Sequence, residues 1–193
     1  MLLMKGSVDG TIKLLQISGK RVLQSFIHCH PTDVDQGQSN LETITEENND
    51  NDNDNDGMTV EGKATMSVEC VGFSSNDYKW VASGGMDNNL KVWDIVTGTC
   101  RVTCPHSGGV VSLLWHTKYP SVTTTSLDNN IRIWDARSGS LLVQLTGHMN
   151  NVTSLDMKCS NDDNDHDHID IISTVSDDYT TKIYHVSTKS LLS

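Results

Sequence analysis

A twelve-residue pattern occurs twice in this chain, almost unchanged, and ends each time in Trp-Asp. The first copy, SGGMDNNLKVWD, spans residues 83–94, and the second, TTSLDNNIRIWD, spans residues 124–135. The two tryptophans, Trp93 and Trp134, lie 41 residues apart. A period of about 40–45 residues that ends in Trp-Asp is typical of a repeat built from one four-stranded sheet, which cannot bury its faces alone. The sequence therefore predicts several sheets stacked on one another.

Aligning the chain on the aspartate that opens the tight turn of this pattern gives four copies. Short segments that alternate between apolar and polar residues flank each turn, as half-buried antiparallel strands do. We therefore predict an all-β chain of about three to four four-stranded antiparallel blades of a β-propeller, with the innermost strand missing from the first. The turn aspartates are Asp9, Asp87, Asp128 and Asp178, and the units are an incomplete blade at 1–28 and blades at 66–106, 107–148 and 149–193.

Two inserts rich in Asn and Asp interrupt the repeat, at residues 29–65 and 160–168. Residues 29–62 contain ten acidic residues, residues 160–168 contain four, and neither stretch has Lys or Arg. Because such segments bury too little apolar surface to offset chain entropy, we expect disordered loops. They also account for the formal net charge of −11, since the remaining residues sum to +3. A chain with acidic loops and no basic stripe is not expected to bind nucleic acid.

Each full repeat carries polar residues at matching positions. In the third copy we expect the indole N–H of Trp134 to bond the hydroxyl of Thr124, the hydroxyl to bond His106, and the imidazole to bond Asp128, because buried polar groups need partners. The first copy keeps only the turn aspartate. The corresponding residues are His148, Thr174, Asp178 and Tyr184 in the fourth copy, and Ser83, Asp87 and Trp93, without an obvious histidine, in the second.

Three chemical alternatives compete with a structural role. A hydroxyl, a histidine and an aspartate could form a catalytic triad, but a nucleophile site occurs once, whereas this set recurs. Residues 52–57, DNDNDG, match the first half of an EF-hand calcium loop, yet Lys63 stands where the bidentate glutamate is needed. Residues 166–168, HDH, could bind a metal, although a flexible acidic loop favours solvated side chains. We therefore expect no enzyme, cofactor or metal site, and keep a calcium-responsive module as a remote alternative.

Cysteine usage and hydropathy indicate the compartment. The five cysteines are odd in number and contain no Cys-x-x-Cys, and Cys100 and Cys104 are too far apart along a strand for an easy bridge. We expect free thiols in a reducing compartment. The start of the chain is too short for the apolar part of a signal peptide, and no later segment approaches a membrane span. The sequence therefore predicts a soluble, cytoplasmic protein.

Longer strings of residues resemble a known family. The strings HSGGVVSLLW at 106–115, SLDNNIRIWDARSG at 126–139, GSVD at 6–9 and SVECVGF at 67–73 are similar to segments of WD40 propellers of the angio-associated migratory cell protein family. This resemblance implies a scaffold or adaptor that binds other proteins without catalysis or cofactors. It also implies an alternative, a ribosome-assembly chaperone that holds a basic segment of a large-subunit ribosomal protein.

Members of that family are longer and close into a ring, so this chain resembles their C-terminal half. We expect a truncated gene model, with closure by pairing with another copy and an open array of blades as the alternatives. An open array exposes strand edges and blade faces, which natural propellers avoid. Missing blades upstream, or self-association, are therefore expected.

Overall fold

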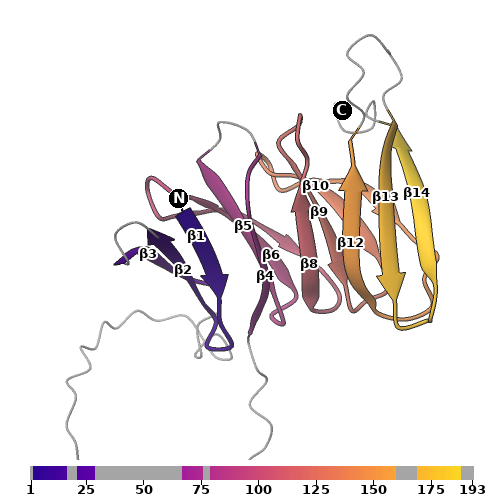
Figure 1. Cartoon of the computed structure of the whole chain (residues 1–193), viewed down its shortest axis with the longest axis horizontal. Helices are drawn as coiled ribbons and strands as arrows, with labels where there is room; N and C mark the ends of the chain where they lie inside the picture. The colour runs from indigo at the N-terminus through magenta and orange to yellow at the C-terminus, as the bar shows by residue number, and fades with distance from the viewer. Residues whose placement is uncertain (1, 17–20, 29–66, 76–78, 160–168, 188–193) are drawn as a thin grey trace, which may run out of the picture.

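The computed structural model describes residues 2–16, 21–28, 67–75, 79–159 and 169–187. In these residues every regular element is a β-strand, and the strands form four antiparallel sheets. Figure 1 shows the sheets stacked side by side in chain order, from the N-terminal sheet at one end to the C-terminal sheet at the other. The predicted all-β architecture of stacked blades is confirmed. The two Asn/Asp-rich inserts lie outside the described residues.

The four sheets are called blades 1 to 4. Blade 1 contains β1 (Leu2–Gly6), β2 (Thr11–Gln16) and β3 (Arg21–Ile27), and blade 2 contains β4 (Val68–Phe73), β5 (Trp80–Gly85), β6 (Asn89–Asp94) and β7 (Cys100–Pro105). Blade 3 contains β8 (Val110–Trp115), β9 (Ser121–Ser126), β10 (Ile131–Asp135) and β11 (Leu141–Leu145), and blade 4 contains β12 (Val152–Lys158), β13 (Ile169–Ser176) and β14 (Thr181–Ser187).

The same tight turn forms one hairpin in every blade. In each turn the aspartate Oδ1 accepts a hydrogen bond of 2.9–3.1 Å from the backbone N–H two residues later. The intervening residue adopts a positive φ, which glycine and asparagine tolerate well. Aspartate followed by such a residue therefore fixes the register of the two strands. The intervening residues are Gly10, Asn88, Asn129 and Tyr179, with φ of 77°, 63°, 70° and 62°.

The cores lie between neighbouring blades. Apolar side chains from the facing sides of two blades form a cluster at each of the three junctions, as stacking repeats require. The blade 1–2 cluster contains Ile12, Leu14, Phe26, Val68, Val81 and Trp93; the blade 2–3 cluster contains Ala82, Leu90, Val92, Cys104, Leu113, Trp115, Val122, Trp134 and Ala136; the blade 3–4 cluster contains Ile133, Ile172 and Val186.

Blades 1 and 4 have three strands each within the described residues. The fourth strand expected for blade 4 would follow Ser187, in residues that are not described. Within the described ranges we find no apolar helix of bilayer-spanning length.

Candidate functional site

The polar set of blade 2 joins segments that are far apart in the chain. Trp93 Nε1 donates to Ser83 Oγ at 2.8 Å, and this hydroxyl lies 2.6 Å from Nδ1 of His28. His28 Nε2 lies 3.0 Å from Oδ1 of Asp87. No histidine is obvious for this set in the sequence, and the structure shows that His28 fills the place. It precedes Ser83 by 55 residues and lies on the far side of the 29–65 insert. All three links of the expected chain are present here.

In blade 3 the chain of hydrogen bonds ends differently. Trp134 Nε1 donates to Thr124 Oγ1 at 3.2 Å, and Thr124 Oγ1 lies 2.9 Å from His106 Nε2. The imidazole does not continue to Asp128 as expected. Its Nδ1 donates instead to the carbonyl oxygen of Cys104 at 3.1 Å. The first two links hold, and the third is replaced by a bond to the backbone.

Arg132 explains this difference. Its Nη1 donates to both carboxylate oxygens of Asp128, at 3.0 and 2.8 Å, and the backbone N–H of Ser107 adds a bond of 3.0 Å. The carboxylate therefore has its partners without the imidazole. Burial, and next the charge of Arg132, lower the pKa of His106 to about 4. A neutral His106 with its proton on Nδ1 fits the bond to a carbonyl oxygen.

In blade 4 the first link is missing. His148 Nε2 lies 2.9 Å from Thr174 Oγ1, and Nδ1 lies 2.8 Å from Asp178 Oδ2. Tyr184 stands at the tryptophan position, but its hydroxyl donates to the carbonyl of Thr146 at 3.3 Å. The reason is the shape of the side chain, since a phenol carries its hydroxyl at the far end of the ring and an indole carries its N–H on the side. The expected role of Tyr184 in the set is not observed.

Hydrogen bonds hold the pKa values of Asp87 and Asp178 well below the usual range. For Asp87, burial acts in the opposite direction, but the hydrogen bond and charge of His28 and the bonds from Asn89 outweigh it. For Asp178, the Thr180 hydroxyl is the largest cause, and the amide of Met149 and His148 add to it. Both carboxylates are therefore ionised at neutral pH and fixed in place.

Burial favours the structural interpretation of these sets over the catalytic one. The hydroxyls that a triad would use belong to Ser83, Thr124 and Thr174, and all three side chains are fully buried. A nucleophile has to reach a substrate carbonyl, whereas a hydroxyl inside a blade can only serve its protein neighbours. The sets tie the second and third strands of a blade to the loop that enters it.

A different polar cluster links blade 3 to blade 4. The possible ligand atoms of His116, Cys159 and Asp170 lie within 4.8 Å of one another, the one such trio in the described part of the chain. His116 Nε2 is 2.5 Å from Asp170 Oδ2, while Nδ1 accepts backbone N–H groups of Lys118 at 3.0 Å and Tyr119 at 3.1 Å. An imidazole that accepts at Nδ1 carries its proton on Nε2.

The position of the His116 proton on Nε2 decides whether the cluster can hold a metal ion. A metal ion on Nε2 would move the proton to Nδ1, where it would face two N–H donors instead of the carboxylate or carbonyl oxygen that usually accepts it. The contacts therefore fit a buried hydrogen bond from His116 to Asp170 between blades, and they do not fit a metal centre. The two other metal candidates, residues 52–57 and 166–168, lie outside the described residues.

The loops that carry the blade 4 set expose two large side chains. Met149 follows the histidine of the set and is 85% exposed, and Tyr179 follows the aspartate and is 101% exposed. The residues equivalent to Tyr179 in blades 2 and 3 are Asn88 and Asn129, and all three have positive φ. Asparagine tolerates this conformation better than tyrosine does. Blade 4 thus holds an aromatic ring in open solvent at a position that suits a small polar residue.

Three of these features were not predicted from the sequence. His28 could have been found by searching before the insert for the histidine that the other repeats supply. Tyr179 could have been found by comparing the residue after each turn aspartate, where blades 1 to 3 have Gly or Asn. No sequence signal marks the pairing of His116 with Asp170, because it depends on how two blades stack.

The amino-acid sequence of this chain is similar to a family model and to curated proteins. The family model WD40, "WD domain, G-beta repeat", matches residues 57–94, 98–135 and 139–185. Angio-associated migratory cell protein of Homo sapiens is 32% identical over 185 residues, which are 96% of this chain and 36% of the human protein. The Canis lupus familiaris protein is 31% identical over the same length. The chain therefore spans about a third of the length of these curated relatives.

Solved structures give the same fold. Saccharomyces cerevisiae Sqt1 superposes with a TM-score of 0.73 at 13% identity, covering 96% of this chain and 40% of Sqt1. The computationally designed protein Ika4 superposes with a TM-score of 0.63 at 22% identity, covering 96% of this chain and 85% of Ika4. At these identities the likeness concerns the fold alone. The three repeats that match the family model show that this chain belongs to the WD40, or G-beta repeat, family.

Proposed function

We propose that this chain is a non-catalytic scaffold that binds another protein at the end of blade 4 formed by loops 148–151 and 177–180. The observation that carries this proposal is the full exposure of Tyr179, together with the 85% exposure of Met149 on the loop that is hydrogen-bonded to Asp178. Tyrosine and methionine are enriched in protein–protein interfaces, where aromatic side chains often anchor binding. The two loops contain Asp177 and Asp178 and no Lys or Arg, which favours a protein partner over nucleic acid.

The two loops form a rigid base for these side chains. The backbone N–H of Met149 donates to Asp178 at 2.9 Å, and the backbone N–H of Asp177 donates to the carbonyl of Asn151 at 3.0 Å. Ser176 Oγ donates to the carbonyl of Asn150 at 3.0 Å. Because the loops are already fixed to each other, binding would lose little conformational entropy in the backbone.

The conformation of Tyr179 supports a role in binding. A tyrosine with a φ of 62° costs stability relative to asparagine or glycine, and the exposed ring gains nothing from the fold in return. A cost of this kind is expected where a side chain serves another purpose. We further propose the cytosol as the compartment, which the free thiols of Cys70, Cys100, Cys104 and Cys159 support.

The test compares the natural chain with a double variant, Met149→Ser with Tyr179→Asn, which copies Ser107 and Asn129 of blade 3. A partner is first captured from a cytosolic extract on the natural chain, identified, purified and titrated by calorimetry. We expect the double variant to bind at least tenfold more weakly. Val96→Thr, an exposed change in the loop after β6, is the control and should bind normally. Equal affinity of all three proteins would contradict the proposal.

A second candidate function is a chaperone for a basic ribosomal protein segment. The ten acidic residues without Lys or Arg at 29–62 favour it, because a basic segment would gain charge complementarity there. In the same capture experiment this function predicts one basic large-subunit ribosomal protein, with an affinity that falls steeply as salt rises. A partner whose affinity is insensitive to salt would favour the general scaffold instead.

A further inference from the structure

Blade 3 packs on blade 4 with a side chain at a position where blades 1 and 2 have glycine. The residue three positions before the turn aspartate lies against the first strand of the next blade. A Cβ atom on Gly6 would lie 2.8 Å from Val68, and one on Gly84 would lie 2.5 Å from Val110. Thr125 occupies this position in blade 3. The first strand of blade 4 therefore cannot approach blade 3 as closely as the other junctions allow.

Two hydroxyls on the same face of β9 are buried without a hydrogen-bond partner. Ser121 is 2% exposed and Thr125 is fully buried, and in the part of the chain that the structure describes they are the two buried side chains whose polar atoms lack a partner. They alternate along β9 with Val122 and Thr124, which face blade 2, so they face blade 4. A buried hydroxyl without a partner loses its bonds to water, and separation of blades 3 and 4 would restore them.

The apolar cluster between blades 3 and 4 is also the smallest of the three. Its buried members are Ile133, Ile172 and Val186, whereas the other two clusters have six and nine buried members, including the tryptophan of the second blade in each case. Blade 4 has Tyr184 at the tryptophan position, and its hydroxyl donates to the carbonyl of Thr146. Less buried apolar surface therefore holds this junction closed.

A buried polar pair joins the two blades directly. His116 follows β8 and Asp170 lies near the start of β13, and both side chains are 3% exposed. Their hydrogen bond of 2.5 Å crosses the junction, and the backbone N–H groups of Lys118 and Tyr119 fix the orientation of the imidazole. Water can satisfy both groups once the blades separate, whereas it offers no comparable exchange to an apolar cluster. This junction therefore depends on one polar contact more than the other two do.

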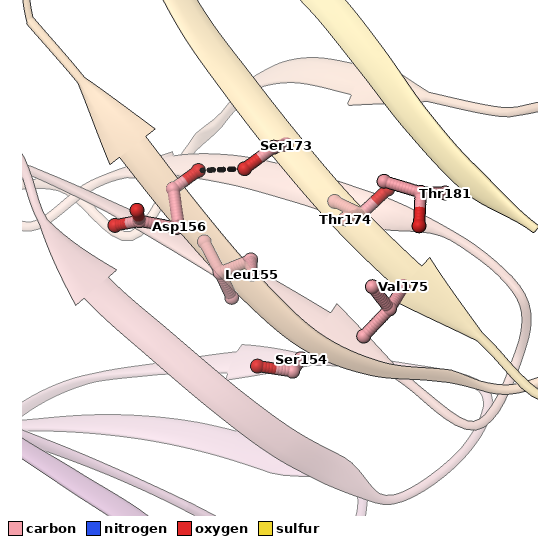
Figure 2. Close-up of a pocket in the computed structure, with 7 residues that line it drawn as sticks. All are labelled: Ser154, Leu155, Asp156, Ser173, Thr174, Val175 and Thr181. Carbon is pink, nitrogen blue, oxygen red and sulfur yellow. Dashed lines mark hydrogen bonds between the residues drawn. The ribbon is translucent and has the colours of Figure 1, made fainter.

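Hydrogen bonds inside blade 4 hold its strands together independently of blade 3. Ser173 Oγ donates to the carbonyl of Asp156 at 3.5 Å, a bond between β13 and β12 that Figure 2 shows beside the hollow that these strands line. Thr153 Oγ1 donates to the carbonyl of Val175 at 3.4 Å, and β13 pairs with β14 along most of its length. Blade 4 can therefore move as one body.

The chain enters blade 4 through a residue that can act as a hinge. β11 ends at Leu145, and Gly147, with a φ of 130°, directly precedes His148. The corresponding residue before His106 of blade 3 is Pro105. Proline fixes its own φ, whereas glycine adopts a wide range of backbone angles. Rotation at Gly147 can therefore change the angle between blades 3 and 4.

We infer that the junction between blades 3 and 4 is a hinged junction that opens before the other two, and that the His116–Asp170 hydrogen bond is the contact that holds it closed. Blade 4 separates from blade 3 as a unit, by rotation at Gly147, and opening gives water access to the Thr125 hydroxyl and to Ile133. Both blades of every junction lie within the described residues, so the comparison concerns the packing between them and does not depend on where the sequence begins or ends.

Thiol labelling of the folded full chain tests the inference. Leu14, Val92 and Ile133 lie five residues after the turn aspartates of blades 1, 2 and 3, and each is buried at a different junction. Leu14→Cys, Val92→Cys and Ile133→Cys therefore place one buried thiol at each junction in turn. N-ethylmaleimide labels a thiol when its junction opens, and mass spectrometry of peptides measures the rate at that position. Urea unfolding of each variant gives the labelling expected from global unfolding alone. Beyond that contribution, we expect labelling at position 133 to be roughly tenfold faster than at positions 14 and 92.

A second substitution in each cysteine variant tests the polar contact. Asp170→Asn removes the charge that strengthens the bond from His116 and keeps the shape of the side chain, so labelling at position 133 should rise severalfold and labelling at positions 14 and 92 should not change. Thr125→Val removes an unpaired hydroxyl from the junction and should slow labelling at position 133. His106→Asn is the control, because it replaces a buried histidine of blade 3 that makes no contact with Asp170, and it should not speed labelling at position 133 more than at position 92.

Two outcomes would overturn the inference. They are equal labelling at the three positions after global unfolding is subtracted, and an effect of Asp170→Asn that is equal at all three. If the Asp170→Asn variants do not fold, the comparison of the three single cysteine variants still decides whether this junction opens first. The inference does not depend on partner binding at Met149 and Tyr179. The Met149→Ser, Tyr179→Asn substitutions should leave labelling at position 133 unchanged, so failure of one proposal leaves the other standing.

Discussion

At the scale of single residues, the three polar sets show how one substitution redirects a buried network. Blade 2 has Lys91 where blade 3 has Arg132, four residues after the turn aspartate in each case. The lysine ammonium lies 3.6 Å from Asp87 and leaves an oxygen for His28, whereas the guanidinium of Arg132 occupies both oxygens of Asp128. Guanidinium groups bind carboxylates through more than one bond, which a lysine does not match. His106 of blade 3 therefore donates to a backbone carbonyl oxygen, that of Cys104, instead of to the aspartate.

Adjacent threonines of β9 provide a matched pair of substitutions. Thr124 and Thr125 are both fully buried, but Thr124 has three hydrogen-bonding neighbours, whereas the Thr125 hydroxyl has no partner. We expect Thr125→Val to raise the free energy of unfolding by about 1 kcal/mol, because it removes an unsatisfied hydroxyl without changing volume. Thr124→Val should lower it by about 1–3 kcal/mol. Urea unfolding measures both, and an equal loss in the two variants would contradict the assignment.

The lowered pKa of His106 predicts a specific loss of stability in mild acid. The unfolded chain binds this proton near pH 6.5, whereas the folded chain binds it only near pH 4. Between these values the unfolded state holds more protons, so the free energy of unfolding falls as pH falls, by at most about 3 kcal/mol from this group. Urea unfolding at several pH values between 7 and 4 measures the slope.

A His106→Asn variant is the control for this slope. It has no titrating group at this position, so its free energy of unfolding should depend less on pH between 6.5 and 4, although its stability at pH 7 is lower. The aspartates contribute in a separate window. The pKa values of Asp87 and Asp178 are depressed from 3.8, so their contribution is present above that value and is lost as pH falls below it. If the free energy of unfolding of the His106→Asn variant depends on pH as steeply as that of the natural chain, the lowered pKa of His106 is contradicted.

At the scale of elements, close approach of strands at a blade junction depends on glycine. A Cβ atom on Gly84 of β5 would lie 2.5 Å from Cγ1 of Val110 on β8. We expect Gly84→Ala to lower the free energy of unfolding by about 1–3 kcal/mol through overpacking. The loss should appear as a lower midpoint in thermal or urea unfolding.

A double-mutant cycle separates this clash from an effect on the strand itself. Val110→Ala removes the methyl group that a new side chain at position 84 would meet, at the cost of a cavity of its own. Together the two substitutions should destabilise less than the sum of their separate effects. If the effects simply add, the cost of Gly84→Ala lies within blade 2, in β5 or at Cys70 of β4, whose Sγ would lie 2.7 Å from the new Cβ, and the junction is not its cause.

The strands themselves could be predicted from the sequence because their information is local. Alternation of apolar residues and an aspartate turn specify each hairpin, as in blade 1, where β2 (Thr11–Gln16) follows directly on the turn that Asp9 opens. Which side chains contact one another depends instead on residues that are far apart in the sequence. The link from His28 to Asp87 spans 59 residues and crosses an insert, and the link from His116 to Asp170 depends on the stacking of two blades. Local periodicity in the sequence predicts neither of these two contacts.

At the scale of the whole molecule, the main contacts between blades in the described residues join neighbours in the stack, so position in the stack sets how well a blade is covered. Blade 3 packs against a neighbour on both faces, and every residue of β9 is buried. Blades 1 and 4 each leave one face open, and their exposed apolar residues include Leu3 and Ile183. Stability in such an array is close to a sum of repeat and junction contributions.

This arrangement predicts a gradient of hydrogen exchange along the stack. We expect the amides of β9 and β10 to exchange most slowly and those of β1–β3 and β12–β14 to exchange faster, because the end blades of this chain can open without disturbing blade 3. Ile12→Ala, at the junction of blades 1 and 2, should speed exchange in these two blades and leave blade 4 unchanged. Mass spectrometry of peptic fragments resolves the blades. Equal exchange in all four blades, or faster exchange of blade 4 in the variant, would mean that the stack opens as one cooperative unit.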